Sequence, residues 1–228
     1  MKYSVLLADA DGTLFDFHKG EINALVETFS IFNLPVTKEH LDCYHIVNQK
    51  QWELLEQGKT TQKALRVDRF SNYLNEMKLK ASAEELSSCY IECLSKQKIL
   101  LPGALEFVKK ISKEIPIYLV TNGIAKVQRG RFTDCEISPY ISKIFISEEV
   151  GEAKPHPAMI KQALSYANVT NKEAILFGDS ISADIGAANN AGIDSCLFWQ
   201  QNKNVPVGHG ATYVVNSFEE ASKIILTK

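Results

Sequence analysis

The sequence predicts an α/β protein, in which a doubly wound, mainly parallel sheet is interrupted after its first strand by an inserted helical bundle. Three observations support this prediction. An apolar strand occupies residues 3–9, a long helical stretch follows over residues 21–98, and short apolar runs alternate with helical patterns beyond residue 101. Alternation of strands and helices is typical of βαβ units and therefore of a parallel sheet.

The helical stretch is defined by side chains, most of them apolar, that recur at steps of three and four residues. One such series is Leu41, Tyr44, Asn48, Trp52 and Leu55. Turn signals at Leu34-Pro35, at Gly58-Lys59 and over residues 80–82 divide the helical stretch. We therefore expect three or four antiparallel helices.

The later part of the chain supplies most of the predicted sheet. Ser217 and Glu220 form a capping-box pattern that opens a final helix. Because a single strand is not stable alone, the first strand is expected to join the later ones. The predicted domains are thus a core of residues 1–15 and 100–228 and a helical domain of residues 16–99. The expected strands are 117–120, 144–146, 174–177 and 195–198, and the expected helices lie near 124–132, 157–166 and 181–189.

Composition narrows the class of partner. The 228 residues are 45% hydrophobic and 23% charged, with a net charge of −2 and no basic cluster of the kind that binds nucleic acid or anionic membranes. The five cysteines lack framework spacing, so free thiols are expected. No signal-peptide pattern or long apolar run is present, which favours the cytoplasm. We expect a small-molecule partner and leave monomer and homodimer open.

The chemistry is concentrated at the ends of predicted strands. Asp9-Ala10-Asp11-Gly12-Thr13 follows the first strand, so two carboxylates lie at the edge where open α/β sheets bind ligands. Like charges this close need compensation, which a hard divalent cation held by oxygen ligands provides.

Three later segments add to this pair of acids. Thr121-Asn122-Gly123 places a hydroxyl and turn amides at a strand end, where they can donate to an anion. Lys154 precedes Pro155 and Pro157, which hold it in a rigid setting. Asp179 ends a buried strand, and Asp184 lies about one helical turn beyond it. Mg²⁺ together with a phosphate monoester would satisfy the acids, the hydroxyl and the lysine.

These residues resemble the four motifs of the haloacid dehalogenase superfamily. The first motif is Asp9-x-Asp11-Gly12-Thr13, the second is Thr121, the third is Lys154, and the fourth is Gly178-Asp179 with Asp184. The order and spacing match over nearly the whole chain. The resemblance implies a Rossmann-like core with a helical cap domain.

The resemblance also implies a role for each residue. Asp9 would be the nucleophile that forms an aspartyl-phosphate, and Asp11 the general acid and base. Asp9, the backbone carbonyl of Asp11, and Asp179 would bind Mg²⁺. Thr121 and Lys154 would hold the phosphoryl oxygens with help from Asn122, and Asp184 would orient Lys154 or groups around the metal.

Substrate choice is narrowed by two features. A phosphate ester releases an alkoxide that needs a proton, whereas halide does not, so Asp11 favours phosphatase over dehalogenase chemistry. The inserted helices resemble the cap of nucleotidases that act on pyrimidine nucleoside monophosphates. Asn48 would then offer amide hydrogen bonds, and Trp52 an apolar face, to a base.

Other functions remain open at this point. A sugar-phosphate phosphatase or a phosphomutase would use the same core residues. A haloacid dehalogenase is disfavoured by Asp11, and a non-catalytic binding module by the presence of Asp9, Asp11 and Asp179 together. The leading prediction is a Mg²⁺-dependent 5′-nucleotidase.

Overall fold

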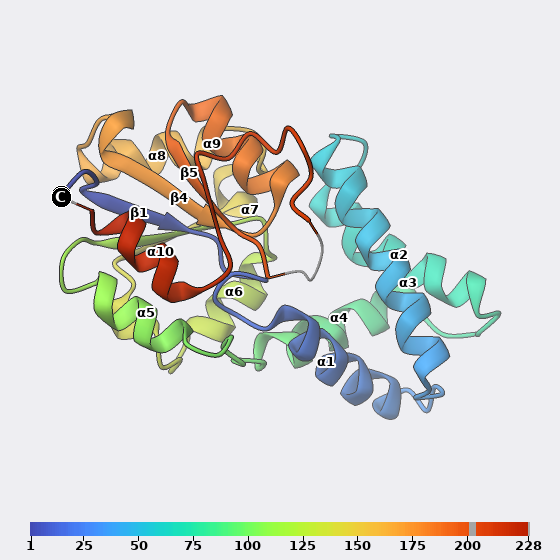
Figure 1. Cartoon of the computed structure of the whole chain (residues 1–228). Coiled ribbons are helices and arrows are strands. Elements are labelled where there is room, and N and C mark those ends of the chain that lie inside the picture. Colours follow the sequence, from blue (N-terminus) through green and yellow to red (C-terminus); the bar gives the residue numbers. More distant parts are fainter. Residues whose placement is uncertain (201–203, 228) are drawn as a thin grey trace. The chain divides into compact units, whose positions relative to one another are not determined.

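The computed structural model describes residues 1–200 and 204–227, and the chain divides into two compact units. Unit 1 carries the sheet, and unit 2 is helical (Figure 1). Unit 1 comprises Met1–Asp16, Leu100–Ala125 and Phe132–Lys228; unit 2 comprises Phe17–Ile99 and Lys126–Arg131.

The sheet of unit 1 contains six parallel strands among the described residues, in the order β3-β2-β1-β4-β5-β6. The order reverses at β1, which lies between β2 and β4, and such switch points are where open α/β sheets bind ligands. The expected strands are present, and β6 was not predicted. The strands are β1 (Val5–Ala8), β2 (Ile117–Thr121), β3 (Lys143–Ile146), β4 (Ala174–Gly178), β5 (Asp194–Phe198) and β6 (Tyr213–Val215).

Helices cover both faces of the sheet, as expected for strands that are buried on both sides. Helices α5 and α10 pack on one face, where Phe107 and Phe218 contact Phe177 of β4. Helices α8 and α9 pack on the other face, against the strand side chains that alternate with those facing α5 and α10. Their bounds are α5 (Ala104–Ile111), α8 (Ala158–Ala167), α9 (Gly186–Ala191) and α10 (Phe218–Ile225).

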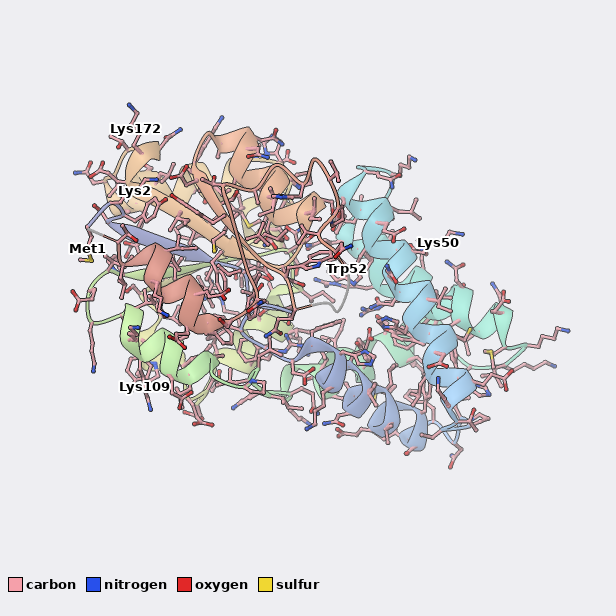
Figure 2. The ribbon with its side chains drawn as sticks, in the orientation of Figure 1. Met1, Lys2, Lys50, Trp52, Lys109 and Lys172 are labelled. Atoms are coloured by element: carbon pink, nitrogen blue, oxygen red, sulfur yellow. The ribbon has the colours of Figure 1, made fainter. Side chains whose placement is uncertain are left out.

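The amino-terminal end of the sheet is a polar surface without catalytic features. Lys2 donates to Asp194 over 2.7 Å, and the Tyr3 hydroxyl donates to the same carboxylate over 2.6 Å. Figure 2 shows Lys2 and Lys172 at this end of unit 1. Asp9, Thr121 and Asp179 lie at the opposite, carboxyl ends of the strands.

Unit 2 contains four long helices, which confirms the upper of the two expected numbers. Thr37, Thr61 and Ser82 cap three of them by accepting a hydrogen bond from a backbone N–H in the first turn. Its interior is aromatic, and the rings of Tyr44 and Tyr90 lie 5.5 Å apart. The helices are α1 (Phe17–Ile31), α2 (Lys38–Glu56), α3 (Gln62–Glu76) and α4 (Ala83–Ser95), with most of α6 (Ala125–Phe132) in the same unit.

None of the helices within residues 1–200 and 204–227 has the length and apolar character needed to cross a membrane. The five cysteines are free, as predicted.

Candidate active site

The first acid of the site lies directly after the central strand β1. Asp9 is 6% exposed, and its N–H donates to the Phe177 carbonyl of β4 over 2.9 Å. The chain then turns at Gly12, whose φ of +84° suits glycine. A Cβ atom at this position would lie 2.5 Å from Oδ2 of Asp179, so the turn passes close to the second acid.

Lys154 links the two buried acids of the site, Asp9 and Asp184. Its Nζ donates to Oδ1 of Asp9 over 2.5 Å, to Oδ1 of Asp184 over 2.6 Å and to the Val120 carbonyl over 2.7 Å. These three bonds use the three ammonium protons. The lysine is 2% exposed, so its charge acts in a medium of low dielectric constant.

The end of β2 fixes the backbone around this lysine. The Asn122 side chain accepts from the Lys154 N–H over 2.7 Å and donates to the Lys154 carbonyl over 2.9 Å. The neighbouring hydroxyl of Thr121, 1% exposed, accepts from the Gly123 N–H over 3.1 Å. Asn122 therefore positions Lys154, a contact that the sequence did not predict.

The end of β4 supplies the remaining two acids. Thr13 donates to Oδ1 of Asp179 over 3.0 Å, which joins the first and fourth motifs. A π-helix over Ile181–Ile185 then places Asp184, whose Oδ2 accepts from the Ser180 N–H over 3.0 Å. Single turns of π-helix are frequent at functional sites.

The electrostatics of the cluster oppose full ionisation. Burial, reinforced by the charges of Asp184 and Asp179, raises the pKa of Asp9 well above its usual range, although Lys154 acts in the other direction. Burial and Asp184 raise the pKa of Asp179 to about 7. Burial disfavours the charged form of Lys154, but Asp184 and Asp9 outweigh it and raise the pKa of the ammonium group.

The cluster has the composition of a site for a hard divalent cation. Carboxylate oxygens of Asp9, Asp179 and Asp184 all lie within 4.8 Å of one another. When all four groups are ionised, three carboxylates and the Lys154 ammonium leave two uncompensated negative charges in a buried region. A divalent cation with oxygen ligands would cancel them, so the residues present fit Mg²⁺.

The structure therefore brings together most of the predicted residues. Asp9, Lys154, Asp179 and Asp184 are in one cluster, and Thr121 ends the neighbouring strand β2. Asp11 lies in the turn after β1, where its backbone forms an isolated β-bridge with that of Phe15. Thr13 and the Val120 carbonyl were not assigned roles from the sequence, because a hydroxyl and a backbone carbonyl carry no pattern of their own.

The two predicted base-contacting residues lie on α2 in unit 2. Asn48 is buried, and its amide donates to Glu21 over 2.8 Å and accepts from Arg69 over 3.3 Å. Trp52, labelled in Figure 2, is partly exposed. The Asn48 amide thus has partners within unit 2, whereas the Trp52 ring keeps part of its surface accessible.

A parallel sheet with acids from two strand ends around one buried lysine defines a class of hydrolase, and sequence comparison agrees. The profile of the family described as haloacid dehalogenase-like hydrolase matches residues 6–198. The chain belongs to this family, which confirms the predicted resemblance.

Individual relatives extend over almost the full length. The chain is 31% identical to the HAD-hydrolase YfnB of Bacillus subtilis strain 168, over 98% of this chain and 96% of that protein. A crystal structure of YfnB, described as bound to magnesium and as revealing interdomain movement, has a TM-score of 0.90 at 30% identity and covers 99% of each chain.

Two further relatives are named as pyrimidine 5′-nucleotidases. YjjG of Escherichia coli strain K12 is 28% identical over 99% of each chain. PynA of Streptococcus pneumoniae is 29% identical over 96% of this chain and 94% of its own length.

Proposed function

We propose that the chain is a Mg²⁺-dependent phosphomonoesterase that prefers pyrimidine nucleoside 5′-monophosphates. The observation that carries this proposal is the cluster of three acids in which Lys154 bonds to Asp9 and Asp184, and the Asp179 carboxylate lies within 4.8 Å of both carboxylates. Such a site neutralises the charge of a phosphoryl group and holds a carboxylate ready to attack it.

In the first step, Asp9 acts as the nucleophile. Its carboxylate oxygen bonds to phosphorus, the ester P–O bond breaks, and Asp11 gives its proton to the departing alkoxide. Lys154 and Thr121 bind the phosphoryl oxygens, and Asn122 keeps the lysine backbone in place. The product of this step is an aspartyl-phosphate at Asp9 and a free alcohol.

In the second step, water attacks the phosphorus of the aspartyl-phosphate. Asp11, ionised after the first step, takes a proton from the water, and inorganic phosphate leaves as the Asp9 carboxylate is regenerated. The residues that would hold Mg²⁺ are Asp9, Asp11 through its carbonyl, and Asp179. The ion supplies positive charge that stabilises the transition state.

We further propose that unit 2 is a cap domain that selects the substrate. The nucleotidase names of two relatives, at 28% and 29% identity, support a nucleotide substrate. Trp52 would supply an apolar face for the base. Asn48 lies on the same helix, α2, where its amide bonds to Glu21 and Arg69. A sugar phosphate would need hydroxyl partners instead, and a phosphomutase would have to protect the aspartyl-phosphate from water.

The nucleophile assignment is tested by replacing Asp9 with Asn. We expect Asp9→Asn to lose Mg²⁺-dependent phosphate release from an aryl phosphate by more than about 10³-fold, because the amide is a poor nucleophile. The matched control is Asp134→Asn, since Asp134 is exposed and its φ of +55° is one that Asn also adopts. Turnover in Asp9→Asn would show that another group attacks phosphorus.

The substrate class is tested with a panel of nucleoside monophosphates, sugar phosphates and short-chain phosphates. We expect the highest kcat/KM for pyrimidine nucleotides. Equal values over the panel would reject the nucleotide preference while leaving the phosphatase chemistry in place. Transfer of phosphate between two positions of a sugar would indicate a mutase.

A further inference from the structure

A second cluster of metal-ligating side chains lies within unit 2, apart from the acids of unit 1. His18 and Glu21 are on α1, three residues apart and hence on the same helix face, and His45 is on α2. One ligand atom from each of the three lies within 4.8 Å of the others. The two imidazole rings meet edge to face with their centroids 5.2 Å apart.

The carboxylate of this cluster is held rigidly. Glu21 is 1% exposed; its Oε2 lies 2.7 Å from Nδ1 of His45, and its Oε1 accepts from the Asn48 amide over 2.8 Å. Asn48 in turn accepts from the guanidinium of Arg69, which is also buried. Outer hydrogen bonds of this kind fix the orientation of metal-ligating carboxylates.

The two histidines are able to adjust around that fixed carboxylate. His18 is exposed, and the His45 side chain is 45% exposed. Both line a cavity of about 400 Å³ whose walls include Ile22, Leu25 and Leu41. Ligand atoms in a tetrahedral zinc site are about 3.3 Å apart, given bonds of about 2.0–2.1 Å. A tetrahedral site would therefore require the ligand atoms, which lie within 4.8 Å of one another, to move closer together.

We propose that His18, Glu21 and His45 bind a borderline transition-metal dication, with Zn²⁺ as the representative ion. Two imidazoles and one carboxylate suit Zn²⁺ and discriminate against Mg²⁺, which prefers oxygen ligands. Three protein ligands leave a fourth position for water in the cavity. The site differs in its donor atoms from the all-oxygen cluster of unit 1.

The test is calorimetric titration with Zn²⁺ of protein that has been stripped with a chelator and then saturated with Mg²⁺. In an Asp179→Asn background, which weakens the unit 1 cluster, one equivalent of Zn²⁺ is expected to bind. His18→Gln and His45→Gln should each reduce that affinity by at least about tenfold. The matched control is His209→Gln, a histidine of unit 1, which should not change it.

Co²⁺ gives a readout that does not depend on heat or activity. Co²⁺ in the Asp179→Asn protein should show visible absorption bands of a four- or five-coordinate ion with nitrogen ligands, lost in both histidine variants. Circular dichroism establishes that these variants are folded. The proposal is overturned if no Zn²⁺ binds in the Asp179→Asn background, or if folded His18→Gln and His45→Gln bind it with unchanged affinity. The 2.7 Å contact between Nδ1 of His45 and Oε2 of Glu21 would then be an ion pair only.

Discussion

At the scale of single residues, the core site depends on two glycines that allow acids to approach the backbone. A Cβ atom on Gly178 would lie 2.3 Å from Oδ2 of Asp184, and one on Gly12 would lie 2.5 Å from Oδ2 of Asp179. Neither distance is compatible with non-bonded contact. The sequence placed both glycines in motifs at strand ends, but only the structure shows that they make room for carboxylates.

Gly178→Ala is therefore expected to damage catalysis more than folding. The added methyl group would displace Asp184, which holds Lys154 through a 2.6 Å contact. A shift of about 1 Å in a catalytic group lowers rate by about a hundredfold, so kcat should fall by at least tenfold.

The control for this variant is Gly58→Ala in unit 2. Gly58 has a positive φ of 67° but nothing within 4 Å of a Cβ atom, so it should lose about 1 kcal/mol of stability and retain kcat. If Gly178→Ala also retained kcat, the position of Asp184 would not matter for turnover.

The pKa of Asp179 predicts how pH affects the metal-free protein. Its value of about 7 lies above the ordinary value of 3.8, so the folded state binds more protons than the unfolded state between these values. The free energy of unfolding should consequently fall as pH rises from about 4 to about 7, and then level off.

Because Mg²⁺ binds ionised carboxylates, the increase in Tm that it causes should be larger at pH about 8 than at pH about 5. Differential scanning fluorimetry with and without Mg²⁺ measures this difference. Asp179→Asn should greatly reduce the effect at pH about 8. An equal Mg²⁺ shift at both pH values would contradict the linkage.

The grouping of the candidate site residues was predictable to the degree that position along the strands determines which side chains meet. Asp9, Asp179 and Lys154 could be placed because parallel strands end at one edge of a sheet. The pair of hydrogen bonds from the Asn122 side chain to the Lys154 backbone could not be predicted, since it joins residues 32 apart through a specific side-chain geometry. Glu21, His18 and His45 also gave no signal, because they come together only through side-chain contacts between α1 and α2 in the folded unit.

At the scale of secondary-structure elements, the turn that carries Asp184 is unusual. The sequence predicted one helix over residues 181–189, whereas the structure has a π-helix over Ile181–Ile185 followed by α9. Apolar periodicity does not distinguish them, since a single π-helical turn of five residues is too short to show a period different from that of an α-helix. The unpredicted β6 is only three residues long, which leaves little pattern to detect. The unpredicted α5 buries Ala104, Phe107, Val108 and Ile111, a helical spacing that the sequence analysis did not use.

Ser180→Ala tests the contribution of this turn. The Ser180 hydroxyl accepts from the Ala183 N–H over 3.1 Å, and loss of such a cap costs about 1 kcal/mol. Because Asp184 follows in the same turn, kcat should also fall several-fold.

Ser82→Ala is the matched control, since Ser82 caps α4 by accepting from Glu85 over 3.2 Å. It should cost similar stability without a change in kcat. Chemical denaturation and steady-state assays of the two variants separate these effects, and equal activities would show that the cap serves folding alone.

At the scale of the whole molecule, two units with different interiors share one chain. The core of unit 1 is mostly aliphatic, with most of its phenylalanines on one face of the sheet, whereas unit 2 encloses tyrosines and the guanidinium of Arg69. Arg69 lies 4.8 Å from the ring centroid of Tyr90, which stabilises its buried charge. This division is consistent with chemistry in unit 1 and selection in unit 2, as proposed.

Trp52→Ala tests whether selection and chemistry are separate. If the indole contacts the base, its loss should lower kcat/KM for a pyrimidine nucleotide by about tenfold, because stacking on an aromatic ring contributes about 1–3 kcal/mol per base. An aryl phosphate has no nucleobase to lose contact with, so its kcat/KM should change little. Ile46→Ala is the control, since Ile46 is 67% exposed on the same helix. A parallel loss of activity toward both substrates in Trp52→Ala would mean that Trp52 supports the fold of α2, and the base-contact proposal would fail.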